Sequence, residues 1–337
     1  RLGGFADSEL GWETTTQTNI GLDLGFFNSR LNVIANYYNS ISTDILYNAP
    51  ISAISGFTSS TTNMTDAKIR NRGFDLQVDA RLLTGKVKWN VSTNISINRN
   101  KVVSLGGLDD ILSTSERSVQ SHITKEGYPI GSFYGYKAVG IMSELDYKNA
   151  LKDREVYLAN GSKFPAGYTL QGPAVPSYAL DDLSYGNTIW KDVCGVIDTN
   201  DKTILGNAYP DFTGGFSTSL SWKGFDLGAS FTYSYGGEVI NFQDYYLFNV
   251  EGSSNQYAIA ADRYVSDTNP GRNNVPIATR ISVTNQSLKL SSYYVEDASY
   301  FRCSNITLGY TLPKRLLRKI GVESCRVYVS GDNLFTI

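Results

Sequence analysis

The side chains that most often perform catalysis or bind metals are sparse in this sequence. His122 is the single histidine among 337 residues, so neither a Ser-His-Asp triad nor a histidine metal site can be assembled. The three cysteines, Cys194, Cys303 and Cys325, fit no metal-binding spacing, and we interpret them as isolated packing residues. Paired carboxylates could still act as acid and base, but nothing in the sequence brings two of them into one cleft. We therefore expect no enzyme and no cofactor.

The elements that position the polar side chains are predicted to be β-strands. In the segment VKWNVSTNISIN (Val87–Asn98), mostly apolar residues occupy the odd positions and polar residues the even ones, which gives a strand one apolar and one wet face. The same alternation occurs at 12–26, 68–82, 211–222 and 225–235. Asn, Ser, Thr, Asp and Gly dominate the polar faces, while Lys and Glu are few, which favours a lumen over a soluble exterior. The side chains predicted to face this lumen are Asp75, Gln77, Asp79, Asn90, Asn94 and Asp226.

The lengths of the strands and of their connections predict an all-β fold that is part of a transmembrane antiparallel barrel. The strands run for roughly 11 to 15 residues, whereas ordinary strands average about 5 to 6. Short turns join residues 26 to 31, 82 to 87 and 222 to 225, and long segments join 47 to 68, 100 to 211 and 236 to 299. Short periplasmic turns and long extracellular loops are typical of outer-membrane barrels, and such barrels have aromatic girdles.

Aromatic residues cluster at the short turns. Phe26 and Phe27 flank the first turn, Trp89 follows the second, and Trp222 and Phe225 bracket the third. This placement favours a girdle at the membrane–water boundary, although aromatics are also common strand formers.

Composition excludes some classes of function. The net charge of −2 gives no electrostatic reason to expect nucleic acid as a partner. No run approaches 18 apolar residues, so we expect no transmembrane helix. The sequence starts at Arg1 without a charged and then apolar leader, which indicates either a cytoplasmic protein or part of a longer chain.

Long stretches of the sequence resemble the SusC/RagA family of TonB-linked outer-membrane proteins of Bacteroidetes. The family's late barrel region is similar to residues 294–337, which include YFRCSNITLGYTLP and CRVYVSGDNLFT, and its earlier part is similar to LGWETTTQTNIGLDLGFFNSRL in residues 10–46. Residues 126–142 (EGYPIGSFYGYKAVGIM) and 206–227 (GNAYPDFTGGFSTSLSWKGFDL) agree as well. The resemblance covers nearly the whole chain, with the stretches in order.

The resemblance implies a carboxy-terminal barrel portion, truncated at both ends, with plug and first strands absent. The parent barrel would have about 22 strands, and residues 101–210 would be a long loop region with one or two strands. The resemblance further implies import across the outer membrane of glycan oligosaccharides or peptides. The implied partners are a SusD-like surface lipoprotein as a lid, outer-membrane lipid, and the TonB complex through the missing amino-terminal part.

Two segments are candidate sites within this resemblance. The family often has a calcium-loop-like motif where this chain reads KDVCGVIDTNDKTILGN; Asp192, Asp198, Asn200 and Asp201 remain, but the Asn-Gly-Asp core is lost, so we expect a polar loop without metal. The segment NFQDYYLFN (241–249) could contact a substrate, because aromatic side chains beside polar ones stack on sugars or hold peptides. Loop packing or contact with the lid protein is the favoured alternative. The residues concerned are Asn241, Gln243, Asp244, Tyr245, Tyr246 and Phe248.

A second fold satisfies the same alternation. A soluble, secreted β-sandwich that binds carbohydrate or acts as an adhesin would place the apolar faces of Trp89 and Phe231 in a dry core. The two folds differ in what covers Val91, Ile95 and Leu227, together with Leu76: lipid in a barrel, or a second layer of the same molecule in a sandwich.

Overall fold

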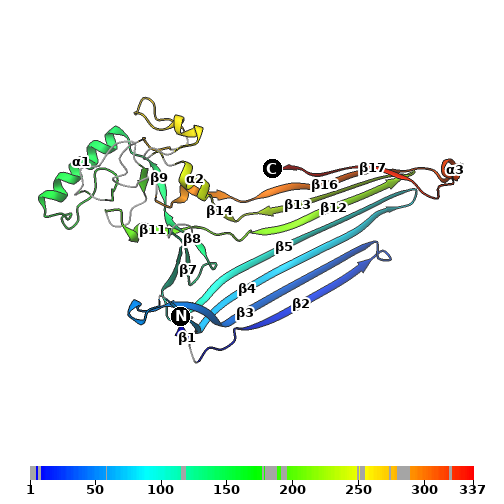
Figure 1. The fold of residues 1–337 in the computed structure, drawn as a ribbon, viewed down its shortest axis with the longest axis horizontal. Coiled ribbons are helices and arrows are strands. Elements are labelled where there is room, and N and C mark those ends of the chain that lie inside the picture. Colours follow the sequence, from blue (N-terminus) through cyan, green and yellow to red (C-terminus); the bar gives the residue numbers. More distant parts are fainter. Residues whose placement is uncertain are drawn as a thin grey trace.

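The computed structural model describes most of the chain. The described residues are 5–6, 9–57, 59–114, 119–176, 178, 188–190, 196–248, 250, 255–272, 275–278, 289–318 and 321–337. Two parts stand out in Figure 1: a sheet of long strands, and a group of short elements at one end of that sheet.

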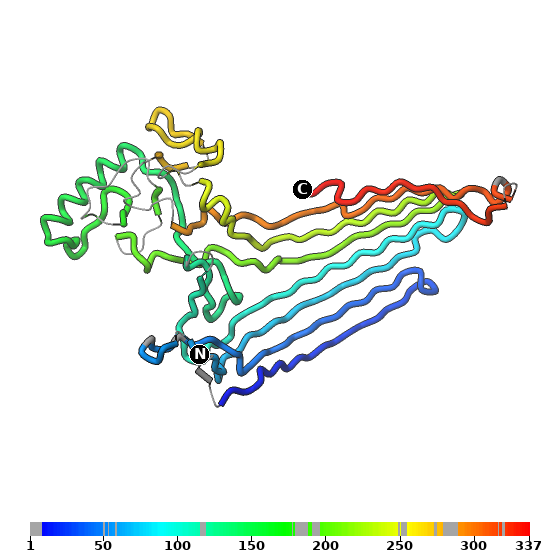
Figure 2. Tube along the Cα trace, viewed as in Figure 1, coloured from blue at the N-terminus to red at the C-terminus, as the bar shows by residue number. Residues whose placement is uncertain are grey.

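In the described part of the chain, eight long strands form one antiparallel sheet, in which each strand pairs with the next long strand along the chain. The strands are β2 (Thr14–Phe26), β3 (Leu31–Pro50), β4 (Ser59–Thr84), β5 (Val87–Leu105), β12 (Phe212–Trp222), β13 (Phe225–Tyr235), β16 (Tyr300–Thr311) and β17 (Arg326–Thr336). A two-residue strand, β1 (Phe5–Ala6), pairs with β4 in parallel. The path from blue to red in Figure 2 follows this order, with β2 at one edge and β17 at the other.

The short connections meet at one end of the sheet, as Figure 1 shows. Phe27, Asn28 and Ser29 adopt positive φ between β2 and β3, and Lys223 and Gly224 do so between β12 and β13. Two residues of positive φ match the twist of paired strands in a tight hairpin. The β16–β17 connection contains the short helix α3 (Lys314–Leu317), and Gly321 follows it at φ 70°. The short turns predicted from the sequence at residues 26–31, 82–87 and 222–225 are therefore confirmed.

The register places apolar residues of successive strands side by side. One row across the paired strands contains Leu24, Val33, Val78, Thr93, Phe216 and Phe231. Large apolar side chains of this face are not covered by other residues; Ile20 is 65% exposed and Leu308 is 54% exposed. The strands of the sheet contact their sheet neighbours, and within the described residues no second layer packs on either face. Leu76, Val91, Ile95 and Leu227 are thus not buried, contrary to what a sandwich requires.

The long connections fold into small sheets and helices at the other end. A four-stranded sheet has the order β11-β8-β7-β6, and two further pairs are β9–β10 and β14–β15. These strands are β6 (Asp110–Thr114), β7 (Gln120–Lys125), β8 (Ser132–Tyr136), β9 (Ala138–Ile141), β10 (Thr188–Trp190), β11 (Lys202–Gly206), β14 (Glu238–Ile240) and β15 (Val295–Asp297). The helices are α1 (Glu144–Ala159) and α2 (Phe242–Leu247), with 3-10 turns η1 (Ala53–Ser55), η3 (Thr199–Asp201), η4 (Ala258–Asp262) and η5 (Ser292–Tyr294).

Residues 101–210 are richer in structure than the sequence indicated. We expected one or two strands there, and the described residues of this range form six short strands and the 16-residue helix α1. The helix starts with a capping box between Ser143 and Asp146, but its apolar residues do not form one stripe, so hydrophobic periodicity does not reveal it. None of the helices among the described residues combines the length and apolar character needed to cross a membrane.

The clusters of buried hydrophobic residues lie among these short elements and their connections. One cluster joins the two longest connections, because Phe133 of β8 packs with Ile240, Tyr245, Leu290 and Tyr294 from residues 236–299.

A buried polar residue, Asp153, lies on α1, and its side chain is fully buried. Its carboxylate accepts hydrogen bonds from the Tyr168 hydroxyl at 2.8 Å, from the Gln171 N–H at 3.0 Å and from the Gly172 N–H at 2.8 Å. A buried carboxylate needs such donors to offset its lost hydration, so Asp153 fastens the segment after α1 back onto the helix.

Candidate functional site: the polar face of the long sheet

The polar residues of the long strands share one face of the sheet. Successive paired residues form a row across seven strands: Asn32, Asp79, Ser92, Ser217, Ser230, Asn305 and Asp332. Each member is directly opposite the next in the ladder, and residues opposite each other point to the same side. The row is therefore a strip of hydroxyl, amide and carboxylate groups perpendicular to the strands.

All six residues predicted to face a lumen lie on this face. Asp75, Gln77 and Asp79 of β4 are opposite Ser96, Asn94 and Ser92 of β5. Asn90 lies opposite Ser219, and Asp226 opposite Ser221.

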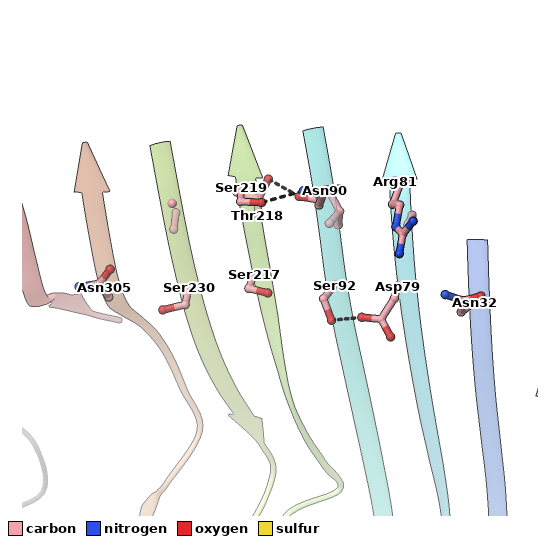
Figure 3. A pocket seen from close by; sticks show the side chains of 14 residues that line it. Asn32, Asp79, Arg81, Asn90, Ser92, Ser217, Thr218, Ser219, Ser230 and Asn305 are labelled. Atoms are coloured by element: carbon pink, nitrogen blue, oxygen red, sulfur yellow. Dashed lines mark hydrogen bonds between the residues drawn. The ribbon is translucent and has the colours of Figure 1, made fainter. Parts of the chain in front are cut away.

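Hydrogen bonds within and between strands fix many of these groups. The Ser92 hydroxyl donates to Asp79 Oδ1 at 2.6 Å, and the Asn90 amide donates to Ser219 Oγ at 3.2 Å (Figure 3). The Gln77 amide donates to the second oxygen of Asp79 at 2.8 Å. Near the short-turn end, the Arg326 guanidinium forms a two-pronged ion pair with Asp226, two strands away.

The ion pair crosses β16 at Gly309. A side chain there would collide with the guanidinium, since a Cβ would lie 2.6 Å from Nη2 of Arg326. Glycine at this position therefore permits the ion pair.

A hollow of about 590 Å³ lies on the polar face between β3 and β16. Figure 3 shows its labelled side chains, among them Asn32, Arg81 and Asn305, contributed by separate strands. Nearly all of its polar side chains are neutral hydroxyls and amides, and its charged groups are Asp79 and Arg81. Such a surface can exchange hydrogen bonds with a polar molecule or with water.

The aromatic residues at the short turns lie on the opposite, apolar face or in the turn itself. Phe26, Trp89, Trp222 and Phe225 are 39 to 49% exposed. The Trp89 indole N–H donates to the Thr218 hydroxyl at 2.8 Å, so its polar atom is satisfied within the sheet. Backbone and side-chain polar groups that face hydrocarbon require such partners.

The predicted contact segment 241–249 is mainly a packing element. The side chain of Asn241 caps α2 by accepting from the Asp244 N–H at 3.1 Å. Tyr245 is 7% exposed inside the core cluster, and Tyr246 and Phe248 pack against that cluster. Gln243 is exposed. Asn249 lies outside the described residues.

Burial and the Glu296 carboxylate raise the pKa of Asp244. Of the residues in this segment, Gln243 is exposed to solvent, whereas the burial of Tyr245 leaves it little surface for a ligand.

In the calcium-like loop, the described aspartates accept backbone hydrogen bonds. The carboxylate of Asp198 accepts from the Asn200 N–H at 2.6 Å, and Asp201 accepts from the Asp198 N–H at 2.7 Å. These bonds form the capping box of η3, and the side chain of Asp201 is buried. A calcium ion needs six to eight oxygen ligands, and nowhere in the described part of the chain do three His, Cys, Asp or Glu residues group suitably for a metal. Asp192 lies outside the described residues.

The single histidine has a structural environment. Ser121 Oγ lies 2.7 Å from His122 Nδ1, and the imidazole packs edge-on against Phe133. Burial lowers the pKa of His122, which favours the neutral ring. Cys303 is buried in β16 and Cys325 is a free thiol, while Cys194 lies outside the described residues.

The fold and its two faces define a class of protein: a wall segment of an outer-membrane transporter barrel. The structure superposes on a chain of the RagAB peptide transporter with a TM-score of 0.72 and 26% identity, covering 98% of this chain and 32% of that one. A second structure of RagAB, in an open-open state, gives a TM-score of 0.70. The predicted transporter-barrel fold is thereby confirmed.

Comparison with related sequences shows to which kind of transporter the chain is related. TonB-dependent receptor P3 of Formosa agariphila is 34% identical over 99% of this chain and 31% of the relative. TonB-dependent receptor SusC of Bacteroides thetaiotaomicron is 27% identical over 98% of this chain and 29% of the relative. No family model matches the sequence. The chain is related over nearly its whole length to TonB-dependent receptors of the SusC/RagA kind, and it spans about a third of the length of these relatives.

Proposed function

We propose that this chain forms part of the barrel wall of a TonB-dependent importer in the outer membrane. The observation that carries the proposal is the row from Asn32 to Asp332, which keeps one face polar across seven strands while the other face stays apolar and open. The apolar face contacts lipid, and the polar face lines the lumen in which a plug and a passing nutrient are hydrated. No bond in the nutrient is broken.

The nutrient in this proposal is a glycan oligosaccharide or a peptide. The similarity to the RagAB peptide transporter supports a peptide, and the mainly neutral hydroxyl and amide groups of the polar face support either ligand. A SusD-like lipoprotein covers the end with the long connections, and the TonB complex supplies the energy through a plug. The relatedness to SusC supports both partners.

Spin labels at two neighbouring residues test which face meets lipid. Val91 and Ser92 are adjacent in β5 and point to opposite faces. In the full-length receptor, with its native cysteines replaced and reconstituted in phospholipid bilayers, a label at Val91→Cys should collide with molecular oxygen, which concentrates in hydrocarbon. A label at Ser92→Cys should instead collide more often with a water-soluble nickel complex.

The opposite pattern, or a Val91 label shielded from both reagents, would refute the lipid-facing assignment. A shielded label is what a second protein layer over this face would produce. Uptake of oligosaccharides and peptides by cells with and without the receptor then tests import, and co-purification from those cells tests the lipoprotein partner.

A further inference from the structure

A second hollow lies where the two longest connections meet, away from the long sheet. Its volume is about 390 Å³, and it lies between the end of β6, the start of β7, the β8–β11 pair and the segment Lys289–Leu290. The side chains that matter for its chemistry are Thr114, Gln120, Tyr136, Lys202 and Lys289.

Two lysines from distant parts of the sequence converge on one tyrosine ring in this hollow. Lys202 begins β11 directly opposite Tyr136 in β8, and its ammonium lies 5.7 Å from the ring centroid. The ammonium of Lys289 lies 4.7 Å from the same centroid. An ammonium over an aromatic face is attracted by the ring, so Tyr136 holds both cations near each other.

The segment that presents Lys289 is tied closely to β8. The Tyr136 N–H donates to the Leu290 carbonyl at 2.9 Å, and Ser291 forms a parallel bridge with Tyr136. At Gly135, a Cβ would lie 2.5 Å from that carbonyl oxygen, so only glycine allows this approach. The Lys202 ammonium in turn donates to Gln120 Oε1 at 3.3 Å.

The electrostatics of the hollow favour an anion. Burial lowers the pKa of both lysines, and the charge of Lys202 lowers the pKa of Lys289 further. Asp201 partly offsets this effect on Lys289, but its carboxylate and that of Asp198 already accept the backbone N–H groups that cap η3. Two partly buried cations that repel each other are stabilised by an anion placed between them.

We propose that this hollow binds an oxyanion, a carboxylate or a sulfate ester carried by the imported molecule, between Lys202 and Lys289. Gln120 and Thr114 supply neutral hydrogen-bonding groups, and the buried Tyr136 ring positions the two ammonium groups. The inference rests on the proposed import function for the statement that the anion belongs to the cargo. Such a site would favour nutrients with acidic groups among those that the importer could accept.

Nuclear magnetic resonance of the purified full-length receptor in detergent tests this site. Its lysines are methylated with ¹³C, which retains their charge, and Lys202→Arg and Lys289→Arg assign the two signals. Sodium glucuronate and sodium sulfate are the probes, because they separate a carboxylate from a sulfate, and glucose is the neutral counterpart of glucuronate. At least one anion should shift both signals saturably, and glucose should shift neither.

Charge removal provides the matched comparison. Lys202→Gln and Lys289→Gln should each weaken binding of that anion at least tenfold, whereas the exposed Lys152→Gln on α1 should leave affinity unchanged. Unchanged signals of the remaining lysines show that each variant is folded. Failure of both anions to shift the two signals, or equal affinity in all three Gln variants, overturns the proposed site.

The same proteins separate this inference from the import proposal. If cells import a nutrient but neither anion binds, the site is refuted and import stands. If an anion binds at the two lysines but cells with and without the receptor take up oligosaccharides and peptides equally, the site stands and its link to cargo is refuted.

Discussion

A single charge placed on either face of β4 should have very different effects on stability. Val78 and Gln77 are neighbours on opposite faces, in the apolar row and on the polar face respectively. Leu83 pairs with Trp89, which places it at the aromatic rim. At about 3.4 Å per residue and a tilt of about 40°, the rise from Leu83 puts Val78 roughly 13 Å from that rim, near the middle of an apolar band about 25 Å tall.

Val78→Arg should therefore destabilise the receptor by about 2–4 kcal/mol, which is the cost of a cationic side chain at the middle of the lipid face of a barrel. Gln77→Arg places the same group on the hydrated face, beside Asp79, and should change the unfolding free energy by less than about 1 kcal/mol. Urea unfolding of the full-length receptor in phospholipid vesicles, followed by tryptophan fluorescence, measures both. Equal costs, or a larger cost for Gln77→Arg, would show that the apolar face does not contact hydrocarbon.

Three further substitutions have defined outcomes. Asp153→Asn leaves buried N–H donors facing an amide and should cost about 1–3 kcal/mol, seen as faster hydrogen exchange in α1; unchanged exchange would contradict this role. Burial and Glu296 raise the pKa of Asp244 in the folded state, so folding loses stability as pH rises from the unfolded pKa through the folded one. Asp244→Asn should then raise the melting temperature at pH 7 and remove the fall in stability with rising pH. An equal fall in the variant would show that Asp244 does not cause it. Arg326→Gln breaks the ion pair with Asp226, but both side chains are more than a third exposed, so solvent screening should keep the loss of stability well below that of Val78→Arg; an equal or larger loss in urea unfolding would show that the pair is shielded from solvent.

The long strands were predictable because their signal is local. In an alternating strand such as β5, about ten residues suffice to show which positions lie on the apolar face and which on the polar face. A tight turn such as Lys223-Gly224 sets the register of its hairpin. This parity places the six residues that were predicted to face a lumen on one face of the sheet. Asn32, Ser217 and Ser230 could have been assigned by the same rule, since each occupies a polar position of its own strand.

The short elements were not predictable in the same way. Strands of three to six residues, such as β7 and β10, are too short for their alternation to stand out, and α1 has no clear apolar stripe. Tyr245 illustrates the consequence for the site. Its neighbours in the sequence suggested a contact surface, but packing against Phe133 and Tyr294 buries it.

The sequence alone determined that this protein has long two-faced strands, with polar groups on one side and apolar groups on the other, because side-chain direction in a strand depends only on whether a position is odd or even. Only the tertiary structure decided that Asn32 and Asn305 lie in one row, or that Lys202 and Lys289 share the ring of Tyr136. These juxtapositions depend on pairing and packing between segments far apart in the chain, and no local pattern encodes which distant partners meet.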